Sequence, residues 1–388
     1  MKTIEQKAKN VPAIRFAGFD DEWKKLSFAD VGNVCMCKRV FKEETSDKGD
    51  IPFYKIGTFG GIPDAYITKE LYNEYRTKFS YPEKGDILLS AAGTIGRIVE
   101  YDGECAYFQD SNIVWLSHDK SITNKFLKVL YPTLKWGGIE GSTIQRLYND
   151  IFLKTSFFKP TISEQQKIGS FFSNIDSLIS LEQKKYDKLT QVKKSMLEKM
   201  FPKEGATVPE IRFAGFTGDW NVQKASKICS ITTGKSNTQD QVDGGLYPFF
   251  IRSDEPVRSN RYLYDEEAVI TIGDGNIGKV FHYVNGKFDL HQRCYKMSDF
   301  KDVLGKYFYY FFSTKFYHRA IKMTAKATVD SVRLEMISEM DIQYPENLNE
   351  QQKIGSYFSH LDSLVSLQQR KLEKLKNIKK SLLEKMFV

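Results

Sequence analysis

The chain has 388 residues, a formal net charge of +8 and a sequence pI near 8.9. This length allows two or more domains with real cores, and 41% hydrophobic with 27% charged residues is typical of a globular protein. The mild positive charge permits a polyanionic partner without requiring one. No apolar run approaches the ~18 residues of a membrane span. The first residues lack the apolar core of a secretion signal, so we expect a cytoplasmic protein with no membrane association.

Five cysteines and five histidines occur at irregular spacings. An odd cysteine count argues against a disulfide framework, so we expect reduced thiols. Cys35 and Cys37 stand close together, but no second Cys or His pair lies near them to complete the four ligands of a structural zinc. We therefore predict no metal site.

Residues 1–160 are predicted to form a first domain behind a short lead-in, which contains the motif VPAIRFAGF at residues 11–19. Short runs rich in Tyr, Phe, Ile and Gly follow between turns, which indicates strands, and residues 121–134 have a helical pattern. The domain is therefore predicted to be mixed and strand-rich.

Residues 161–201 are predicted to form a long helix, with Ser163 as N-cap, Gln166 in a capping box, and Pro202 ending it. Apolar residues recur at spacings of four and three, which indicates a coiled-coil seam. Its members are Ile168, Phe172, Ile175, Ile179 and Leu189. Such a helix of ~38 residues would be roughly 57 Å long.

Residues 202–216 are a linker with a second copy of the lead-in motif, VPEIRFAGF, and residues 217–348 are predicted to form a second strand-rich domain. Residues 349–388 then repeat the long helix without a gap, and 26 of 38 positions are identical between 164–201 and 350–387. Asn349 and Gln352 are its predicted N-cap and capping-box residues. Its seam members are Ile354, Phe358, Leu361, Val365 and Leu375.

Two arrangements of the helices are open. Each could be an arm that pairs with another chain, or the two could pair with each other. We favour an antiparallel pair within the chain, because two equal seams then cover one another. Polar residues interrupt the seams at equivalent places, at Glu182 and Gln368 and again at Lys193 and Lys379, and such positions often fix register.

The two domains share a weak common order. Pro52-Phe53 matches Pro248-Phe249, Gly93–Gly96 matches Gly275–Gly278, and Arg146-Leu147 matches Arg333-Leu334; these pairs predict one fold with different surfaces. The run from Gly273 to Gly278 also fits a dinucleotide-binding fingerprint by its letters. A β-branched and aromatic run follows it where the fingerprint needs a helix, so both glycine runs are interpreted as strand–turn–strand elements.

The sequence carries no phosphate-binding loop, no motif of an amino-methyltransferase, no helicase motif and no convincing nuclease site. We therefore predict a chain without catalytic activity of its own. A methyltransferase or nuclease is the alternative from a different class, and a coiled-coil assembly protein that does not bind nucleic acid is a third. The two divergent domains argue against the last, since a simple spacer does not need them.

The repeated EQQKIGSFF and EQQKIGSYF helices, the Gly-x-Ile-Gly turns and the Arg-Leu pairs resemble specificity subunits of type I restriction–modification systems over the whole length of the chain. The resemblance implies an α+β fold in which two target recognition domains are joined by two long helices, packed as an antiparallel intramolecular coiled coil with a pseudo-twofold repeat. Each domain would read one half of a split double-stranded DNA site, and the helices would set the gap.

The same resemblance implies that two methyltransferase subunits and the restriction (motor) subunits are the partners. S-adenosylmethionine, ATP and Mg²⁺ would be bound by those partners, with no cofactor in this chain, and adenine would be the methylated base.

Arg and Lys suit guanine and phosphate, and Asn and Gln suit adenine, so polar residues near the turns are the candidates for DNA contact. The alternative for each is an ordinary solvated surface position. In the first domain the candidates are Lys55, Arg97, Gln109, Asn112, Ser142, Thr143 and Gln145. In the second domain they are Arg252, Arg258, Arg261, Asn276, Lys279, Gln292, Lys326 and Thr328.

Overall fold

The computed structural model describes residues 10–136, 146–324 and 331–388. The chain divides into two compact units. Unit 1 comprises Met1–Glu182 with Lys371–Val388, and unit 2 comprises Gln183–Arg370.

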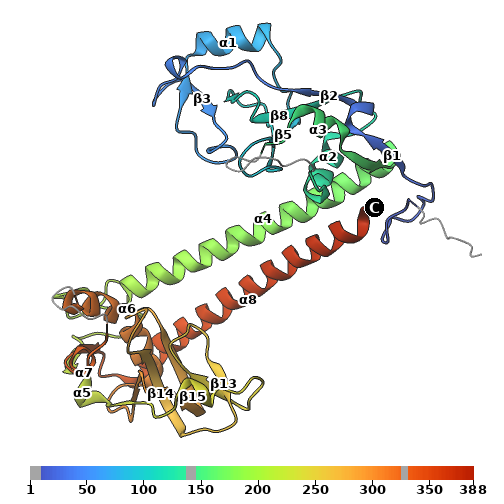
Figure 1. Ribbon diagram of the computed structural model, residues 1–388. Coiled ribbons are helices and arrows are strands. Elements are labelled where there is room, and N and C mark those ends of the chain that lie inside the picture. Colours follow the sequence, from blue (N-terminus) through green and yellow to red (C-terminus); the bar gives the residue numbers. More distant parts are fainter. Residues whose placement is uncertain (1–9, 137–145, 325–330) are drawn as a thin grey trace, which may run out of the picture. The chain divides into compact units, whose positions relative to one another are not determined.

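Each unit contains one strand-rich domain and part of both long helices, which are α4 (Ile162–Lys199) and α8 (Leu348–Met386) (Figure 1). The predicted class, with two mixed strand-rich domains and two long helices, is therefore what the chain adopts. None of the helices within the described ranges is both long and apolar enough to cross a membrane.

Unit 1 is built on a four-stranded sheet in the order β2-β8-β5-β6, beside a three-stranded sheet β4-β3-β7 and a pair β1-β9. The central strand β5 is buried on both faces, as expected of its apolar residues Ile87, Leu88 and Leu89. The strands are β1 (Lys24–Ser27), β2 (Gly32–Cys35), β3 (Ile51–Tyr54), β4 (Tyr66–Ile67), β5 (Ile87–Ser90), β6 (Ile98–Glu100), β7 (Tyr107–Phe108), β8 (Ile113–His118) and β9 (Ser156–Lys159).

The helices that precede α4 in unit 1 are short, and two of them, α1 and α2, begin at a threonine cap. The Thr68 side chain accepts a hydrogen bond from the backbone of Leu71 (3.2 Å), and the Thr123 side chain accepts one from Phe126 (3.3 Å). In Figure 1, α2 and α3 lie beside the first turns of α4. These helices are α1 (Lys69–Lys78), α2 (Asn124–Leu130) and α3 (Asn149–Lys154), with a 3₁₀ turn at Tyr131–Thr133.

Unit 2 has a six-stranded sheet in the order β11-β16-β14-β15-β12-β13 and a separate pair β10-β17. Its strands are β10 (Asn221–Lys224), β11 (Ser230–Thr233), β12 (Tyr247–Phe250), β13 (Val257–Ser259), β14 (Tyr264–Ile272), β15 (Phe281–Leu290), β16 (Cys294–Ser298) and β17 (Asp341–Tyr344). Its helices are α5 (Ala225–Ile228), α6 (Gly305–Thr324) and α7 (Leu334–Ser338).

The two sheets follow one plan with one difference. In unit 2, the long strand β15 pairs with β14 along one edge and in parallel with β12 along the other. In unit 1, β6 pairs with β5 and β7 pairs in parallel with β3, but the residues between these two strands leave the sheet. A strand that is continuous in unit 2 is therefore broken in unit 1, which splits one sheet into two.

The long helices are capped two residues before the predicted N-caps. The Thr161 side chain accepts a hydrogen bond from the backbone of Glu164 (3.4 Å), and the Asn347 side chain accepts one from Asn349 (2.9 Å). Ser163 and Asn349 themselves lie inside helices. The capping prediction was wrong because Thr161 and Asn347 are also good caps and lie next to Pro160 and Glu346, where the chain turns in from the preceding strand.

Within each unit the two helices run antiparallel. In unit 1, Lys379 forms an ion pair with Asp176, and Lys371 Nζ lies 3.0 Å from Glu182 Oε1. In unit 2, Lys193 forms an ion pair with Asp362. Lys193 and Asp362 occupy the positions of Lys379 and Asp176 in the other copy of the repeat, so the same contact occurs once in each unit. The polar interruptions of the seam thus join one helix to the other.

The seam side chains are most buried where the helices meet a domain. Ile168, Phe172, Ile354 and Phe358 are at most 2% exposed, and Leu361 is also buried. The other predicted members are half-buried, namely Ile175, Ile179, Leu189, Val365 and Leu375. Each strongly buried end therefore belongs to a domain core, which includes Trp23 and Phe126 in unit 1 and Trp220 and Tyr307 in unit 2.

Candidate nucleic-acid interface

The repeated lead-in motif clasps the ends of both helices. In unit 1, the Arg15 guanidinium donates two hydrogen bonds to the Glu164 carboxylate, from Nε (2.7 Å) and Nη2 (2.8 Å), and the Ile14 backbone N–H donates to the carbonyl of Lys385 (2.9 Å). The Lys167 ammonium lies 5.4 Å from the centre of the Phe16 ring. One short segment therefore holds the start of α4 and the end of α8.

Unit 2 repeats this clasp with the other end of each helix. Arg212 donates from Nε (2.7 Å) and Nη2 (2.9 Å) to Glu350, and Ile211 N–H donates to the carbonyl of Lys199 (2.9 Å). Lys353 lies over the Phe216 ring at 4.9 Å. Both carboxylates are at most 1% exposed. The sequence repeat in the lead-ins is thus explained by one contact made twice.

The residues after each of these glutamates attach the helix to its domain. The Gln165 side chain accepts from the backbone N–H of Thr123 (2.8 Å) and donates to the carbonyl of Pro160 (3.0 Å). Gln351 does the same with Leu304 (2.8 Å) and Pro345 (2.8 Å). The motif Glu-Gln-Gln therefore acts through its first two side chains, whereas the capping box predicted for the third does not form with Ser163 or Asn349 as its N-cap.

The Gly-x-Ile-Gly turns lie in a backbone frame that is the same in both units. In unit 1, the N–H of Ala91 donates to the carbonyl of Asn112 (2.7 Å), and the carbonyl of Ala91 accepts from Leu147 (2.7 Å). An isolated bridge pairs Ala92 with Arg146. The end of β5, the start of β8 and the segment before α3 therefore meet at one place.

In unit 2, the N–H of Gly273 donates to the carbonyl of Arg293 (2.8 Å), and the carbonyl of Gly273 accepts from Val332 (2.7 Å). The bridge here pairs Asp274 with Ser331. Ala92, Asn112 and Arg146 therefore correspond to Asp274, Arg293 and Ser331. Each turn joins two strands, β5 to β6 and β14 to β15, so the strand–turn–strand interpretation of the glycine runs is confirmed.

This correspondence corrects one sequence match. Arg146-Leu147 was paired with Arg333-Leu334 by its letters, but the hydrogen bonds pair Leu147 with Val332. Arg333 instead precedes α7, at the place that Tyr148 takes before α3. The match of Pro52-Phe53 with Pro248-Phe249 is confirmed, because Phe53 and Phe249 each begin the parallel pairing in their sheets.

The side chains on this frame differ between the units. In unit 1, Arg146 Nη2 donates to Asn112 Oδ1 (2.9 Å) and lies 3.3 Å from Ser111 Oγ. Ser111 has a positive φ of 51°, which is uncommon for a residue with a side chain and often occurs at functional sites. The arginine of this frame therefore comes from the segment before α3.

In unit 2, the frame has its arginine on the turn into β16. Arg293 Nη1 lies 2.8 Å from Asp274 Oδ2, and Arg252 Nη1 lies 3.2 Å from the same carboxylate. Burial acts to raise the pKa of Asp274, but the hydrogen bonds from Arg293 and Arg252 outweigh it, so the pKa is lowered overall. The Asp274 carboxylate thus binds two arginines as a charged acceptor. The side chain of Arg252 is 44% exposed and that of Arg293 is 59% exposed.

A hollow of about 450 Å³ opens beside this carboxylate, and Arg252, Asp274 and Asn276 are among its lining residues. Asn276 lies on the turn itself and is exposed. The hollow therefore offers hydrogen-bond donors and acceptors within unit 2 without an enclosed, apolar site for a small molecule.

The other DNA-contact candidates of the first domain already bind protein groups or lie outside the described residues. Lys55 Nζ pairs with Asp64 (2.9 Å) and remains 42% exposed, and Arg97 Nη1 donates to the carbonyl of Phe59 (3.0 Å). Gln109 Oε1 accepts from the backbone of Ile56 (2.9 Å), which makes it a support of the loop. Ser142, Thr143 and Gln145 lie outside the described residues.

In the second domain, two predicted arginines hold the chain together. Arg258 donates from Nε and Nη2 to the carbonyls of Gly245 (2.8 Å) and Leu246 (2.7 Å), and Arg261 contacts the buried Asp289 (3.3 Å) and Asp240 (2.7 Å). For these residues the structural alternative is the better interpretation.

The remaining candidates of the second domain are exposed or undescribed. Lys279 lies over the Tyr317 ring at 5.7 Å, and Gln292 donates to the side chain of Asn237. Lys326 and Thr328 lie outside the described residues. Three residues of this frame were not predicted as candidates, although each neighbours a predicted candidate or a matched glycine turn, namely Arg146, Asp274 and Arg293.

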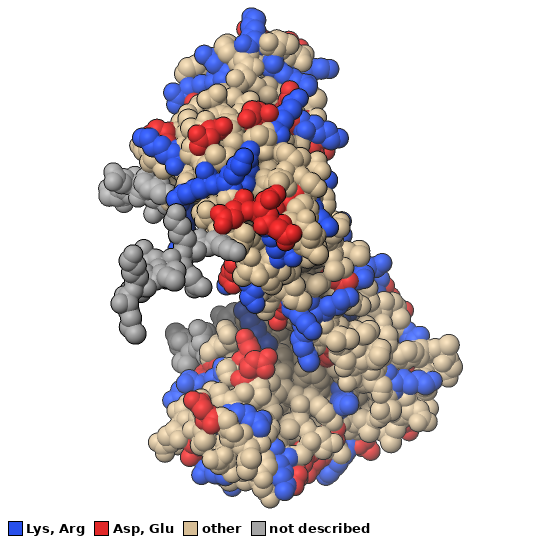
Figure 2. Space-filling model, turned by 90° about the vertical axis from the view of Figure 1, so that its right-hand side faces the viewer, with Lys and Arg blue, Asp and Glu red and all other residues tan. Residues whose placement is uncertain are grey.

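Charge does not concentrate into one basic patch on the face drawn in Figure 2. There, Lys and Arg are interspersed with Asp and Glu in both units, among large uncharged areas. Within the described ranges, no three His, Cys, Asp or Glu side chains form a group that could hold a metal ion. Contacts with a polyanion through this face would therefore come from dispersed side chains and not from a single basic patch.

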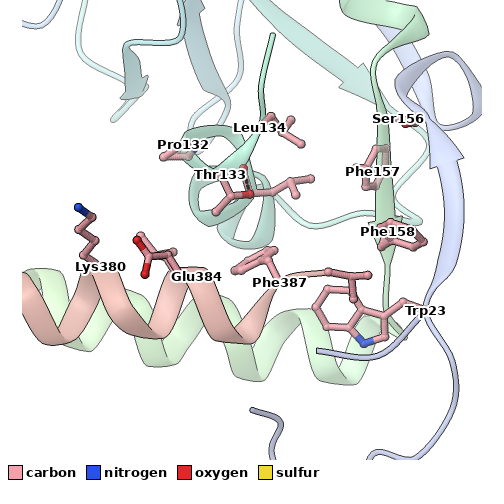
Figure 3. Close-up of a pocket in the computed structure, with 13 residues that line it drawn as sticks. Trp23, Pro132, Thr133, Leu134, Ser156, Phe157, Phe158, Lys380, Glu384 and Phe387 are labelled. Atoms are coloured by element: carbon pink, nitrogen blue, oxygen red, sulfur yellow. Dashed lines mark hydrogen bonds between the residues drawn. The ribbon is translucent and has the colours of Figure 1, made fainter. Parts of the chain in front are cut away.

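The C-terminal ends of α8 and α4 differ in what lies between each helix and its domain. In unit 1, a cavity of about 490 Å³ lies between α8 and the domain, with Phe157, Phe158, Leu383 and Phe387 in its lining (Figure 3). In unit 2, the linker that follows α4 runs across its own domain, where its carbonyl groups accept hydrogen bonds from two domain side chains. These bonds run from Lys315 to Pro202 and from Gln343 to Ala206, both at 2.7 Å.

Residues 20–191 and 217–377 match the family model described as the type I restriction modification DNA specificity domain. The chain belongs to this family. It is a type I restriction–modification specificity subunit by its two specificity domains, and this membership implies recognition of a DNA sequence.

The chain is also similar in sequence to curated specificity subunits of type I restriction enzymes. A putative type I restriction enzyme specificity subunit of Haemophilus influenzae is 53% identical over 165 residues, a match that spans 42% of this chain and 43% of that one. The putative MjaX specificity subunit of Methanocaldococcus jannaschii is 22% identical over 97% of this chain and 95% of its own length.

Two solved structures share the fold. The specificity subunit of a type I restriction–modification system from M. genitalium superimposes with a TM-score of 0.66 at 16% identity, covering 97% of this chain and 99% of that one. A chain from a study of complex assembly and conformational transition in a type I system gives 0.52 at 14% identity, covering 96% of this chain and 99% of that one. These likenesses confirm the predicted fold class.

Proposed function

We propose that each domain of this specificity subunit reads one half of a bipartite DNA site, and that the long helices set the gap between the halves and dock two methyltransferase subunits. The observation that carries the proposal is the duplicated frame at the Gly-x-Ile-Gly turns, which keeps its backbone hydrogen bonds and changes its side chains. Phosphate contacts would supply much of the affinity, and the varied side chains would supply the selectivity.

The same proposal assigns the chemistry to partner subunits. This chain would recognise DNA, while the methyltransferase subunits bind S-adenosylmethionine and methylate adenine, and the restriction subunits bind ATP and Mg²⁺. The glycine turns of this chain lead into the strands β6 and β15, not into a helix whose N-terminus could bind a pyrophosphate. Its own residues therefore fit a recognition role better than a nucleotide-binding one.

Methylome sequencing tests this function directly. Cells would express the chain with and without the methyltransferase subunit of its system. We expect a split motif with methylated adenine only when both proteins are present. Methylation by the chain alone would support an enzyme instead, and a stable complex that methylates no split motif and shows no salt-dependent DNA binding would support an assembly protein.

The role of the helices has its own test. Inserting one heptad into each helix at repeat-equivalent positions would add about 10 Å, or roughly three base pairs, to the gap. We expect the two half-sites to stay the same while their separation grows. Changed half-sites with an unchanged gap would contradict the spacer role.

A further inference from the structure

The shared frame separates what the two units have in common from what they do not. Its backbone hydrogen bonds have nearly the same lengths, at 2.7 and 2.8 Å for the first contact and 2.7 Å in both units for the second. All three side chains at the corresponding positions nevertheless differ in chemistry, as Ala92, Asn112 and Arg146 against Asp274, Arg293 and Ser331. A fixed backbone that carries different side chains in each unit is what two readers of different sequences require.

Each unit also keeps one arginine on the frame, but takes it from a different segment. In unit 1 it is Arg146, before α3, whose guanidinium is held by the Asn112 amide at 2.9 Å. In unit 2 it is Arg293, on the turn into β16, held by Asp274 at 2.8 Å. Where unit 1 has Arg146, unit 2 has Ser331. The arginine therefore occupies a different position of the same frame in each unit.

The geometry of the second arginine suits recognition of a base edge. Arg293 is 59% exposed, and its contact with Asp274 uses Nη1, one of three guanidinium nitrogens. A carboxylate behind an arginine limits its rotamers, so less conformational entropy is lost when the guanidinium binds. Arginine donating two hydrogen bonds to O6 and N7 of guanine is the commonest specific contact in the major groove.

We propose that Arg146 in unit 1 and Arg293 in unit 2 each read a guanine of their half-site, with Asn112 and Asp274 as the residues that position them. The inference rests on the proposed function, because it assigns residues to the half-site readers. It gives each half-site at least one guanine whose recognition depends on a single named side chain. Ala92 and Ser331 complete the frame as the small residues that pair with Arg146 and Asp274.

The alternative is that Arg293, Asp274 and Arg252 form a structural ion-pair group at the surface. Exposed ion pairs contribute little to stability and carry no sequence information. A guanine contact and a structural pair therefore differ in one measurable property, which is the base preference of one half-site.

The test uses the full chain in complex with its methyltransferase subunit, and measures binding to the wild-type site and to a panel with single base-pair changes. For Arg293→Gln, we expect the guanine preference at one position of one half-site to fall by roughly 5- to 150-fold, with a gain for adenine. The other half-site should be unchanged. Arg146→Gln should give the mirrored result in the other half-site.

Three further variants control the experiment. Arg293→Lys should keep a guanine preference, because lysine can also donate to guanine. Asp274→Asn should weaken discrimination at that same position without changing the preferred base. Arg258→Gln is the matched control, since this arginine of unit 2 binds only backbone carbonyls in the contacts described above, and it should leave the recognised sequence unchanged.

The outcomes separate the two proposals. A wild-type complex that recognises no split site would overturn the proposed function and this inference with it. A wild-type split site that Arg293→Gln leaves unchanged would overturn the inference alone. The inference also fails if Arg293→Gln weakens binding to every sequence equally, because this is the behaviour of a phosphate contact.

Discussion

The two units share a frame and differ in how much is built around it. Unit 2 has one continuous strand, β15, where unit 1 has β6 and β7, and unit 1 has α1 between β4 and β5 where unit 2 passes directly from β13 to β14. The contacts that hold the helices are unchanged by these differences. Both clasps and both glutamine anchors keep their hydrogen bonds. The comparison teaches that the contacts which attach each domain to the long helices are separate from the strands and loops that differ between the units.

The largest expected effect comes from opening one clasp at a time. Arg15→Met leaves the Glu164 carboxylate buried without its partner, which should destabilise unit 1 by about 3–5 kcal/mol. Arg212→Met should do the same to unit 2 through Glu350. Hydrogen exchange measured on peptides from each unit would locate the loss, which a single melting temperature of a two-unit protein would not.

Two variants control this measurement. Lys154→Met removes an exposed partner of Asp150 and should change stability by less than about 1 kcal/mol. Arg15→Met combined with Glu164→Met should recover much of the loss, because the buried charge is then gone. Equal loosening of both units by Arg15→Met alone would show that the clasps do not act separately.

An intermediate effect is expected at the glycine of the repeated motif. A Cβ on Gly169 would lie 2.6 Å from Lys125 Cβ and 2.9 Å from the carbonyl carbon of the same residue, whereas one on Gly355 would lie 3.2 Å from Lys306 Cβ. Gly169→Ala should therefore cost about 1–3 kcal/mol through overpacking.

The matched change in the other unit should behave differently. Gly355→Ala should be close to neutral, because the milder contact is offset by the roughly 1 kcal/mol that alanine gains over glycine in a helix. Denaturant unfolding followed by hydrogen exchange checks the pair. Equal losses would contradict the closer approach of α2 to α4 in unit 1.

The smallest effect should appear as a pH dependence of unit 2 alone. Burial lowers the pKa of His282 below its usual 6.5, and burial also lowers the pKa of His291. The unfolded chain then binds more protons, so unit 2 should lose stability as pH falls below about 6.5 until the folded pKa is passed. His118, which is half-buried, is the only histidine of unit 1.

Hydrogen exchange of the two units between pH 7.5 and pH 5.5, corrected for intrinsic exchange rates, would show this difference. His282→Phe should reduce the slope for unit 2. A slope of the same size in unit 1 would assign the effect to some other group.

Periodicity predicted the parts of the molecule that depend on local pattern. The long helices, their seam, the strand-rich domains and the strand–turn–strand elements follow from the spacing of apolar residues and glycines. The polar seam residues Lys193 and Lys379 were expected to fix register, and each forms an ion pair with the opposite helix. The cap positions were wrong by two residues, because two acceptable caps stood close together in each copy.

The residues of the glycine-turn frame, which we propose for recognition, could not be predicted as well, because their correspondence depends on tertiary hydrogen bonds. The segment that leads into β8 in unit 1 corresponds to the segment that leads into β16 in unit 2. It has three residues between Gln109 and Ile113 in unit 1, and two between His291 and Cys294 in unit 2. Because of this one-residue difference, the correspondence of Asn112 with Arg293 cannot be recognised by aligning the two sequences without a gap. Candidates such as Arg258 had suitable chemistry, but their donors already bind backbone carbonyls.

The division of the chain has a consequence for its synthesis. Unit 2 is the uninterrupted stretch from Gln183 to Arg370, whereas unit 1 also needs Lys371–Val388. At about 5–20 residues per second, a ribosome spends roughly 10–40 s on that stretch. During this time Ile168 and Phe172 lack Met386, their neighbour in the core. Unit 1 begins to emerge first, but part of its apolar core stays uncovered until Lys371–Val388 has been made. Unit 2 has all of its residues before that point, so it can complete its fold first.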